Sequence, residues 1–452
     1  MRPALFAVPL ALIAASATAE PRVTTFTLDN GMEGVVIEDN RAPVVTHMVW
    51  YRVGAADEPP GQSGIAHFLE HLMFKGTDTI PEGGFSRVVA ENGGQDNAFT
   101  SRDFTGYFQR IAADRLAIVM EMEADRMRNL RVTERQALTE RDVILEERSQ
   151  VVDNNPGAQF SELMSAALFK HHPYRMPVIG WRAEMETLTR EMALDFYERF
   201  YAPDNAILVV AGDVDPAEVQ ELAEMFFGHH EPSGRPREAR VQEPPHRAAR
   251  RIEMRDARVA QPYMLRQYLV PSRVSGDAET AAALTILAEV LGGSGVTSRM
   301  GRALQVEQEI AIAVAAFYSG LAVDDTSFGV YAMPADGVAP EALEAAVDAV
   351  MAALAAEGPT EAELARARTG VQASEVFAQD SGPGLARRFG AALSVGLTVQ
   401  DVLDWPDLLK AVTAEDVKAA AALLRTEASV TGWLKPAADT ARAEPIREGV
   451  EG

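Results

Sequence analysis

The stretch 64–74, with the sequence GIAHFLEHLMF, constrains the fold of the chain more than any other feature. Its apolar residues predict a helix that is buried nearly all round, with Ser63 as a cap at its start. His67, Glu70 and His71 share one face of this helix, because residues three and four apart are neighbours. Two imidazoles and a carboxylate inside an apolar helix cost free energy unless something binds them. Zinc takes neutral imidazoles at this spacing, so the stretch predicts a metal site.

The alternative interpretation is that both histidines belong to the core and are satisfied by hydrogen bonds. For a single histidine that interpretation would be preferred, but the pattern His-x-x-Glu-His in a buried helix favours metal binding. The pattern is the inverted form of the His-Glu-x-x-His zincin motif, in which the histidines bind the metal and the glutamate activates the metal-bound water. Two histidines leave the metal one protein ligand short, so a third ligand is expected further along the chain.

The helix predicted over 133–154 carries the candidates for the third ligand. It opens with the sequence TERQ, which predicts a capping box. Glu140 and Glu147 are two turns apart along one face, so both can point into the same site, whereas Glu146 lies about a quarter turn off that face. A glutamate on a charged helix more often faces solvent, and this helix has several acidic residues. The pattern alone does not decide between them.

Composition and the N-terminus indicate where the protein works. A length of 452 residues suits two or more domains, and a formal net charge of -24 argues against nucleic acid or anionic membrane surfaces as partners. Residues 1–19 are predicted to be a signal peptide: Arg2 is positive, 4–15 form an apolar core too short to span a bilayer, and 17–19 (ATA) form a cleavage site. The absence of cysteine excludes disulfides and an N-terminal lipid anchor. We expect an exported, soluble protein of the bacterial periplasm, without stable membrane insertion.

A Pro-rich, polar linker at 231–249 divides the mature chain into halves of similar size, and the second half repeats the order of strands and helices in the first. This weak repeat indicates duplication of one α+β unit. Where the first half has the histidine helix, the second has a mostly apolar helix, 281–291, without metal ligands. We therefore predict a catalytic zinc domain at 20–230, a metal-free homologous domain at 250–436 and a polar tail at 437–452.

At this point the motifs resemble those of the pitrilysin family of zinc peptidases, which includes insulinase-like and mitochondrial-processing-peptidase-like members. The similarity extends over nearly the whole mature length and is carried by ordered stretches at family-like spacing, namely GIAHFLEHLMFKGT (64–77), NAFTS (97–101), ERDVILEE (140–147), YAPDN (201–205) and VVAGD (209–213). The resemblance implies an α+β fold of two homologous α/β-sandwich domains, each a mostly antiparallel sheet with helices packed on it.

The resemblance also implies roles for individual residues. Glu147 matches the family's third zinc ligand, and Glu140 matches an additional active-site carboxylate. Asn97 and Ala98 fall on the strand that pairs with extended substrate in the family, and a sheet edge can bind many peptides through its backbone. The implied function is a zinc-dependent endopeptidase, with one zinc per chain, that hydrolyses peptides or unfolded segments. In this mechanism Glu70 takes a proton from the zinc-bound water and passes it to the leaving amine.

One stretch of the second half departs from the family pattern. Many active members carry an arginine and a tyrosine, seven residues apart, that hold substrate against the zinc, and here Gln305 and Ile312 replace that pair. Arg299, Arg302 or Tyr318 are candidates to substitute, although an exposed helix arginine or a strand aromatic is at least as good an interpretation. In two-subunit members a partner without the zinc motif supplies the pair. We therefore expect a homologous partner subunit, or a homodimer.

Two other functions stay open. A non-catalytic scaffold or assembly subunit fits the family, but such members typically lose zinc-site residues, and all of them are present here. A zinc hydrolase of non-peptide substrates is the weaker alternative, because nothing in the sequence indicates a small-molecule pocket. Zinc itself is inferred from the ligand types, and manganese or cobalt could also sustain activity.

Overall fold

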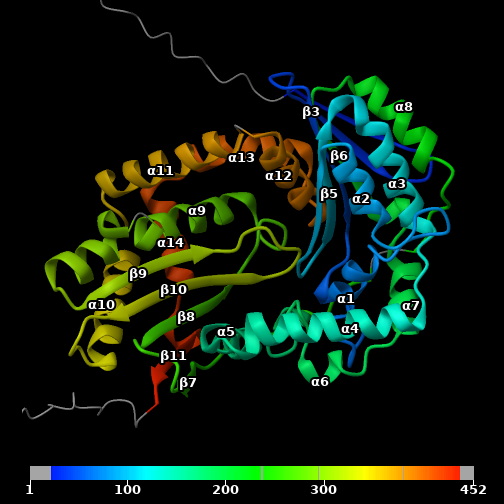
Figure 1. Cartoon of the computed structure of the whole chain (residues 1–452). Helices are drawn as coiled ribbons and strands as arrows, with labels where there is room; N and C mark the ends of the chain where they lie inside the picture. The colour runs from blue at the N-terminus through cyan, green and yellow to red at the C-terminus, as the bar shows by residue number, and fades with distance from the viewer. Residues whose placement is uncertain (1–21, 236–237, 294, 380, 438–452) are drawn as a thin grey trace, which may run out of the picture.

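The computed structural model describes residues 22–235, 238–293, 295–379 and 381–437 (Figure 1). The predicted signal peptide, 1–19, lies outside these ranges, and so does the predicted polar tail apart from its first residue. Within the described ranges no helix is both long enough and apolar enough to cross a membrane.

In the described residues the strands form two sheets, one from each half of the chain (Figure 1). The first sheet has the order β1-β2-β6-β3-β5-β4, and all neighbours are antiparallel except β2 and β6. Its strands are β1 (Arg22–Thr27), β2 (Glu33–Glu38), β3 (Val44–Tyr51), β4 (Gln95–Thr100), β5 (Thr105–Ala112) and β6 (Ala206–Gly212). The second sheet has the order β7-β11-β8-β10-β9, and only β7 and β11 are parallel. Its strands are β7 (Arg250–Asp256), β8 (Tyr263–Val270), β9 (Ala311–Tyr318), β10 (Thr326–Pro334) and β11 (Val430–Pro436).

Helices pack on both sheets (Figure 1). The first half contributes α1 (Ile65–Leu72), α2 (Gly84–Glu91), α3 (Leu116–Arg128), α4 (Glu134–Arg148), α5 (Pro156–Leu168), α6 (Arg182–Met185), α7 (Arg190–Phe200) and α8 (Pro216–Phe227). The second half contributes α9 (Ala278–Ala288), α10 (Pro340–Glu357), α11 (Glu361–Gln379), α12 (Gly382–Ser394), α13 (Val399–Ala411) and α14 (Ala414–Leu423). A π-helical segment, Ser149–Asp153, continues α4 towards α5.

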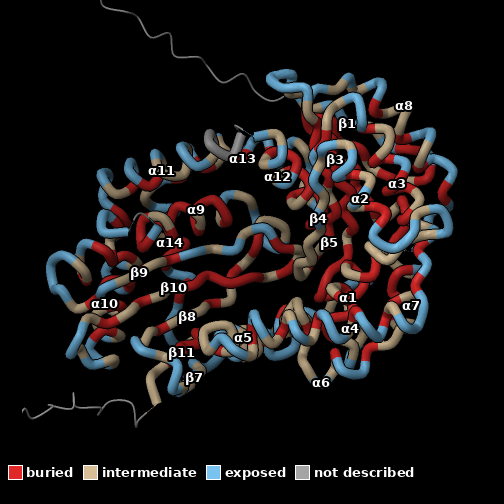
Figure 2. Tube along the Cα trace, viewed as in Figure 1, coloured by how far each residue is buried: buried red, intermediate tan, exposed pale blue. Residues whose placement is uncertain are grey.

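The order of the elements confirms the predicted α+β fold with an internal duplication. The order β2-β6-β3-β5-β4 in the first sheet has the same pattern of connections as β7-β11-β8-β10-β9 in the second. In this correspondence α1, which follows β3, matches α9, which follows β8. Each half has its own core of buried apolar side chains (Figure 2).

Each half also contributes one helix to the sheet of the other half. Helix α12, from the second half, packs Phe389 against the face of the first sheet that carries Trp50. Helix α5, from the first half, packs Phe160 and Met164 against the second sheet beside Val430 of β11. The two halves therefore share apolar cores, rather than meeting only at polar surfaces.

Local sequence signals explain where several helices begin. Helix α4 begins at the predicted capping box: the Thr133 hydroxyl accepts from the N–H of Gln136, and the Gln136 side chain accepts from the N–H of Thr133. Helix α9 begins at Asp277, whose carboxylate accepts from the N–H of Thr280 at 2.6 Å. Strand β6 is buried at every position, because it lies inside the sheet and α12 covers one of its faces. Its unbroken apolar sequence, AILVVA, follows from that position.

Residues 238–249, between the halves, form neither helix nor strand. Several of their side chains are nevertheless buried, among them Arg240, Glu243 and His246. The carboxylate of Glu243 accepts hydrogen bonds from the backbone N–H groups of residues 170–172. This stretch therefore packs against the first half through specific hydrogen bonds.

Candidate metal centre

Helix α1 presents both histidines of the motif from one face. The predicted cap Ser63 is wrong: the helix begins after Gly64, and the Ser63 hydroxyl instead accepts from the N–H of Trp181. The φ of Gly64, 89°, lies in the left-handed region that favours glycine. A Cβ at this position would come within 2.7 Å of the carbonyl oxygen of Ile179. Most of α1 is buried, as predicted (Figure 2). The ring centroids of His67 and His71 lie 4.7 Å apart.

Glu147, on α4, completes a group of three donors. Its Oε2 lies 3.7 Å from Nε2 of His67 and 3.4 Å from Nε2 of His71. One donor atom from each residue lies within 4.8 Å of the other two. Ligand atoms about 2.1 Å from a tetrahedral zinc ion would be roughly 3.4 Å apart, so these residues fit that ion. The Glu147 side chain is 39% exposed, which leaves the group open to solvent on that side.

A hydrogen bond to Glu140 fixes the ring of His71. Its Nδ1–H donates to Oε1 of Glu140 at 2.9 Å, so in the neutral ring Nε2 carries the lone pair that a metal needs. Burial lowers the pKa of His71, but the hydrogen bond and charge of Glu140 outweigh burial and raise this pKa above its usual value. Lys75 contacts the other oxygen of Glu140 at 2.5 Å. Burial raises the pKa of Glu140, but the hydrogen bonds from His71 and Lys75 outweigh burial and hold this pKa below its usual value. Glu140 therefore stays ionised as an acceptor for His71.

The ring of His67, in contrast, is neutral because it is buried. Burial, with the neighbouring His71 adding to the effect, lowers the pKa of His67 to about 3. Its Nε2 faces Glu147, while its Nδ1 has no hydrogen-bond partner among the described residues. The nitrogen that faces the candidate metal position can therefore act as a ligand.

Glu70 lies one turn along the same helix and is 8% exposed. Thr100, at the end of β4, donates a hydrogen bond of 2.5 Å to Oε2 of Glu70. Burial raises the pKa of Glu70, against the opposing effects of Thr100 and His71. A carboxyl group whose pKa lies closer to neutral pH can take up a proton and release it again, which suits a general base.

Strand β4 is the last strand of the first sheet, so one of its edges has no strand partner among the described residues. Asn97 on this strand is exposed and Ala98 is partly buried. The N–H of Ala98 donates to the side-chain oxygen of Asn97 at 2.8 Å. Since Thr100 of the same strand contacts Glu70, the edge lies next to the candidate base. An extended peptide can pair with an edge of this kind.

The five residues of the second half singled out from the sequence lie on β9 and on the segment before it. The side-chain nitrogen of Gln305 donates to the carbonyl oxygen of Ile312 at 2.9 Å, and the Ile312 side chain is 51% exposed. Arg299 forms an ion pair with a glutamate of α11, and the Tyr318 hydroxyl donates to a backbone carbonyl at 2.6 Å. Arg302 is exposed. The polar groups of Arg299 and Tyr318 are therefore engaged within the second half.

Two residues that contact the centre were not singled out from the sequence. Thr100 bonds Glu70, and Lys75 bonds Glu140. Both lie within stretches that carry the family resemblance, and Lys75 lies four residues after His71, just beyond the end of α1. Their place within these stretches is the sequence signal that could have identified both residues. Their partners lie 30 and 65 positions away in the chain, so local spacing could not pair them.

Known proteins match both halves of the chain. Residues 34–181 match the family described as Insulinase (Peptidase family M16), and residues 187–371 match the Peptidase M16 inactive domain. An uncharacterized zinc protease of Mycobacterium leprae is 31% identical over 359 residues, which cover 77% of each chain. The zinc protease PqqE of Helicobacter pylori is 37% identical over 209 residues, 46% of this chain and 47% of that protein. The crystal structure of a protease from Helicobacter pylori has a TM-score of 0.85 at 28% identity, and the match covers 92% of this chain and 100% of that one.

The duplicated fold and these relatives define a class of two-domain zinc proteases. The chain belongs to peptidase family M16, the insulinase family. This assignment confirms the resemblance inferred from the motifs. Among the described residues, the group of His67, His71 and Glu147 is the single cluster with the geometry to hold a metal ion.

Proposed function

We propose that the protein is a zinc-dependent endopeptidase that hydrolyses peptides or unfolded segments, with one zinc ion held by His67, His71 and Glu147. The convergence of these three donors beside Glu70 carries the proposal. Bound zinc would supply a Lewis acid that polarises the scissile carbonyl and acidifies the attacking water.

The chain's own residues perform the remaining steps. Glu70 accepts the proton of the attacking water and delivers it to the leaving amine, and Thr100 orients its carboxylate. Glu140 keeps His71 in the tautomer that offers Nε2. Lys75 holds Glu140 in turn.

Substrate would bind as an added strand on β4. The edge beside Asn97 and Ala98 supplies backbone donors and acceptors for any sequence, so this mode predicts broad specificity. Because Asn97 already occupies the N–H of Ala98, binding would require its side chain to turn away.

A homologous subunit would complete the site, or a second copy of this chain would do so. Gln305 and Ile312 stand where active members have the arginine and tyrosine that hold substrate, and Arg299 and Tyr318 are engaged elsewhere. On this basis the isolated chain binds zinc but turns over slowly. The domain boundaries 20–230 and 250–436, and export to the periplasm directed by residues 1–19, are further proposals from the sequence.

The test is hydrolysis of a mixed pool of quenched-fluorescent peptides by the purified protein, with zinc content measured on the same sample. Glu70→Gln is expected to keep zinc and to lower turnover by roughly 10²–10⁴-fold. Glu147→Gln is expected to lose zinc, whereas Glu146→Gln, which alters the neighbouring exposed carboxylate bonded to Gln150, should change neither property.

Each outcome of this test selects one interpretation. Hydrolysis that survives Glu70→Gln would contradict the role of Glu70. A wild-type protein that holds zinc but is silent would favour the missing-subunit proposal, and addition of a homologous subunit should then restore activity. A silent protein without zinc would favour the scaffold alternative.

A further inference from the structure

Helix α1 starts without a capping side chain of its own. Its N-cap residue is Gly64, which cannot accept a hydrogen bond from the first N–H groups of the helix. Glu58, six residues earlier, takes this role. Both of its carboxylate oxygens lie 3.0 Å from the nitrogen of Gly64, and Oε1 also lies 3.0 Å from that of Ala66. Glu58 therefore binds the backbone on both sides of the helix start, directly before His67.

His67 depends on this backbone more than His71 does. The ring of His71 is held by its hydrogen bond to Glu140. In contrast, Nδ1 of His67 has no partner among the described residues, so its ring is placed by packing and by the path of α1. The helix has only eight residues, and His67 lies in its first turn. A shift of the helix start therefore moves Nε2 of His67 relative to Glu147.

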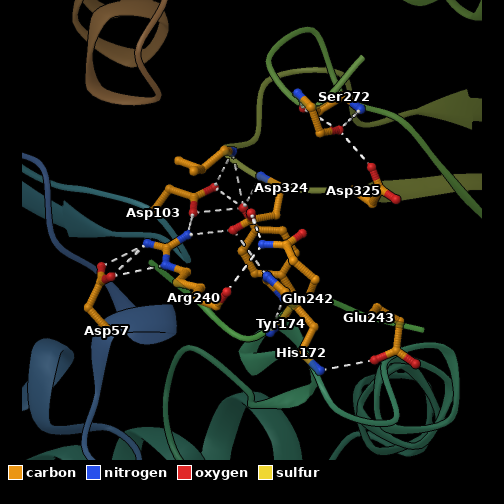
Figure 3. A network of polar contacts seen from close by, with 12 residues as sticks. Asp57, Asp103, His172, Tyr174, Arg240, Gln242, Glu243, Ser272, Asp324 and Asp325 are labelled. Carbon is orange, nitrogen blue, oxygen red and sulfur yellow. Dashed lines mark hydrogen bonds and ion pairs between the residues drawn. The ribbon is translucent and has the colours of Figure 1, made fainter. Parts of the chain in front are cut away.

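Figure 3 shows what holds the segment that carries Glu58. Asp57, the preceding residue, contacts the guanidinium group of Arg240 at 2.8 to 3.0 Å. Arg240 also binds Asp103 and Asp324, and its side chain is 6% exposed. Since Asp324 belongs to the second half, Arg240 connects the Glu58 segment both to the stretch between the halves and to the second half.

Arg240 also binds near the segment that contacts the candidate base, Glu70. Asp103, which it binds, lies three residues after Thr100, the donor to Glu70. Tyr174 donates a second hydrogen bond to Asp103 at 2.7 Å. The segments that bear on both the ligand helix and the candidate base thus meet at one buried guanidinium group.

The capping bonds do not depend on the charge of Glu58. Burial raises the pKa of this carboxyl well above its usual range, and the hydrogen bonds from Ala66 and Gly64 oppose the rise. A neutral carboxyl group still accepts N–H bonds through its carbonyl oxygen. A glutamine would keep one such acceptor, whereas an alanine would keep none.

We propose that Glu58 is a positioning residue for the ligand His67, and that Asp57 and Arg240 hold Glu58 in place. This inference rests on the proposed zinc site, because it concerns the geometry of one of that site's ligands. Groups one contact removed from a metal ligand typically change metal affinity by 10- to 100-fold. Because Glu58 acts through the backbone, we expect an effect near the lower limit.

The test is titration of the full mature protein with Co²⁺, using the visible absorption spectrum to report the ligand geometry and a competing chelator to obtain the dissociation constant. Three variants are compared with the wild type: Glu58→Ala, Glu58→Gln and Asp277→Ala. Asp277 caps α9, the counterpart of α1 in the second half, so its replacement removes a helix cap of the same kind away from the metal. It is the matched control for a loss of stability alone.

Glu58→Ala is expected to weaken Co²⁺ binding about tenfold and to alter the absorption spectrum. Glu58→Gln is expected to restore most of the affinity and of the wild-type spectrum. Asp277→Ala is expected to match the wild type in affinity and spectrum. Wild-type affinity and spectrum in folded Glu58→Ala would overturn the proposal. So would an equal loss in Asp277→Ala. If Glu58→Ala does not fold, Asp57→Asn takes its place, with a severalfold loss expected and unchanged binding decisive against the proposal. A wild-type protein that binds no Co²⁺ would instead refute the proposed metal site itself.

Discussion

Replacement of Asp324 by asparagine would measure how strongly the two halves are coupled. This carboxylate lies in the second half and is 8% exposed. Its Oδ2 lies 3.0 Å from Nε2 of His172 and 3.4 Å from the guanidinium group of Arg240, and its Oδ1 accepts from Gln242 at 2.8 Å (Figure 3). The contact with His172 joins the halves directly, and the other two contacts join the second half to the stretch between them.

The magnitude follows from the pKa of Asp324. Burial raises this pKa, but the contacts with His172, Gln242 and Arg240 outweigh burial and bring it from 3.8 to about 2. One pKa unit corresponds to about 1.4 kcal/mol, so the ionised carboxylate contributes about 2 kcal/mol to the free energy of unfolding. The folded-state pKa is the lower one. The contribution is therefore complete well above pH 3.8 and is lost as the pH falls through about 2.

Urea unfolding followed by tryptophan fluorescence would test this magnitude, because Trp50 and Trp433 are buried in the first and second halves. Asp324→Asn is expected to lower the free energy of unfolding by about 2 kcal/mol at pH 7, and this difference should fall by about half between pH 5 and pH 3. Asp325→Asn, which removes a neighbouring carboxylate that accepts an exposed hydrogen bond from Ser275, should change it by less than about 0.5 kcal/mol. A loss for Asp324→Asn that is no larger than in this control, or that does not shrink towards acid, would refute the reasoning.

Two further substitutions give outcomes of defined sign. Gly390→Ala on α12 should lower the free energy of unfolding in urea by about 1–3 kcal/mol, because the new Cβ would lie 2.1 Å from Cε2 of Trp50. Alanine usually stabilises a helix relative to glycine, so a higher free energy of unfolding would contradict the close packing. Lys75→Met removes the ion pair that holds Glu140 and should weaken zinc binding about tenfold in a chelator competition. Unchanged affinity would show that His71 orients Glu140 without help from Lys75.

The histidine part of the centre could be predicted because its signal is local. His67, Glu70 and His71 are fixed relative to one another by helix geometry once the helix itself is recognised. Glu147 needed the family resemblance, since its helix offers several acidic residues and spacing alone does not choose among them. The structure places it beside both histidines.

The supporting contacts could not be predicted, since each one depends on how distant segments pack. Thr100 reaches Glu70 only because β4 lies beside α1. Arg240 binds Asp103 and Asp57, which lie 137 and 183 positions earlier in the chain. No element was predicted over 381–411, where the structure has α12 and α13. Helix α12 packs on the sheet of the other half of the chain. Sequence periodicity can indicate that a helix has an apolar face, but it does not indicate which distant sheet that face contacts.

The exchange of helices couples the half that carries the candidate metal ligands to the half that lacks the equivalent residues. Helices α5 and α12 are equivalent in the duplication, because each follows the second long helix after the equivalent strands β5 and β10, and each packs on the opposite sheet. On β6, Leu208 and Val210 face the core that contains α1, whereas Ile207 and Val209 face α12. Alternate residues of a strand point to opposite faces, so one strand supports the metal helix on one side and is covered by the second half on the other. Without α12 that apolar face would be exposed to water beneath the sheet on which α1 rests, so the second half supports the candidate metal centre through the shared core.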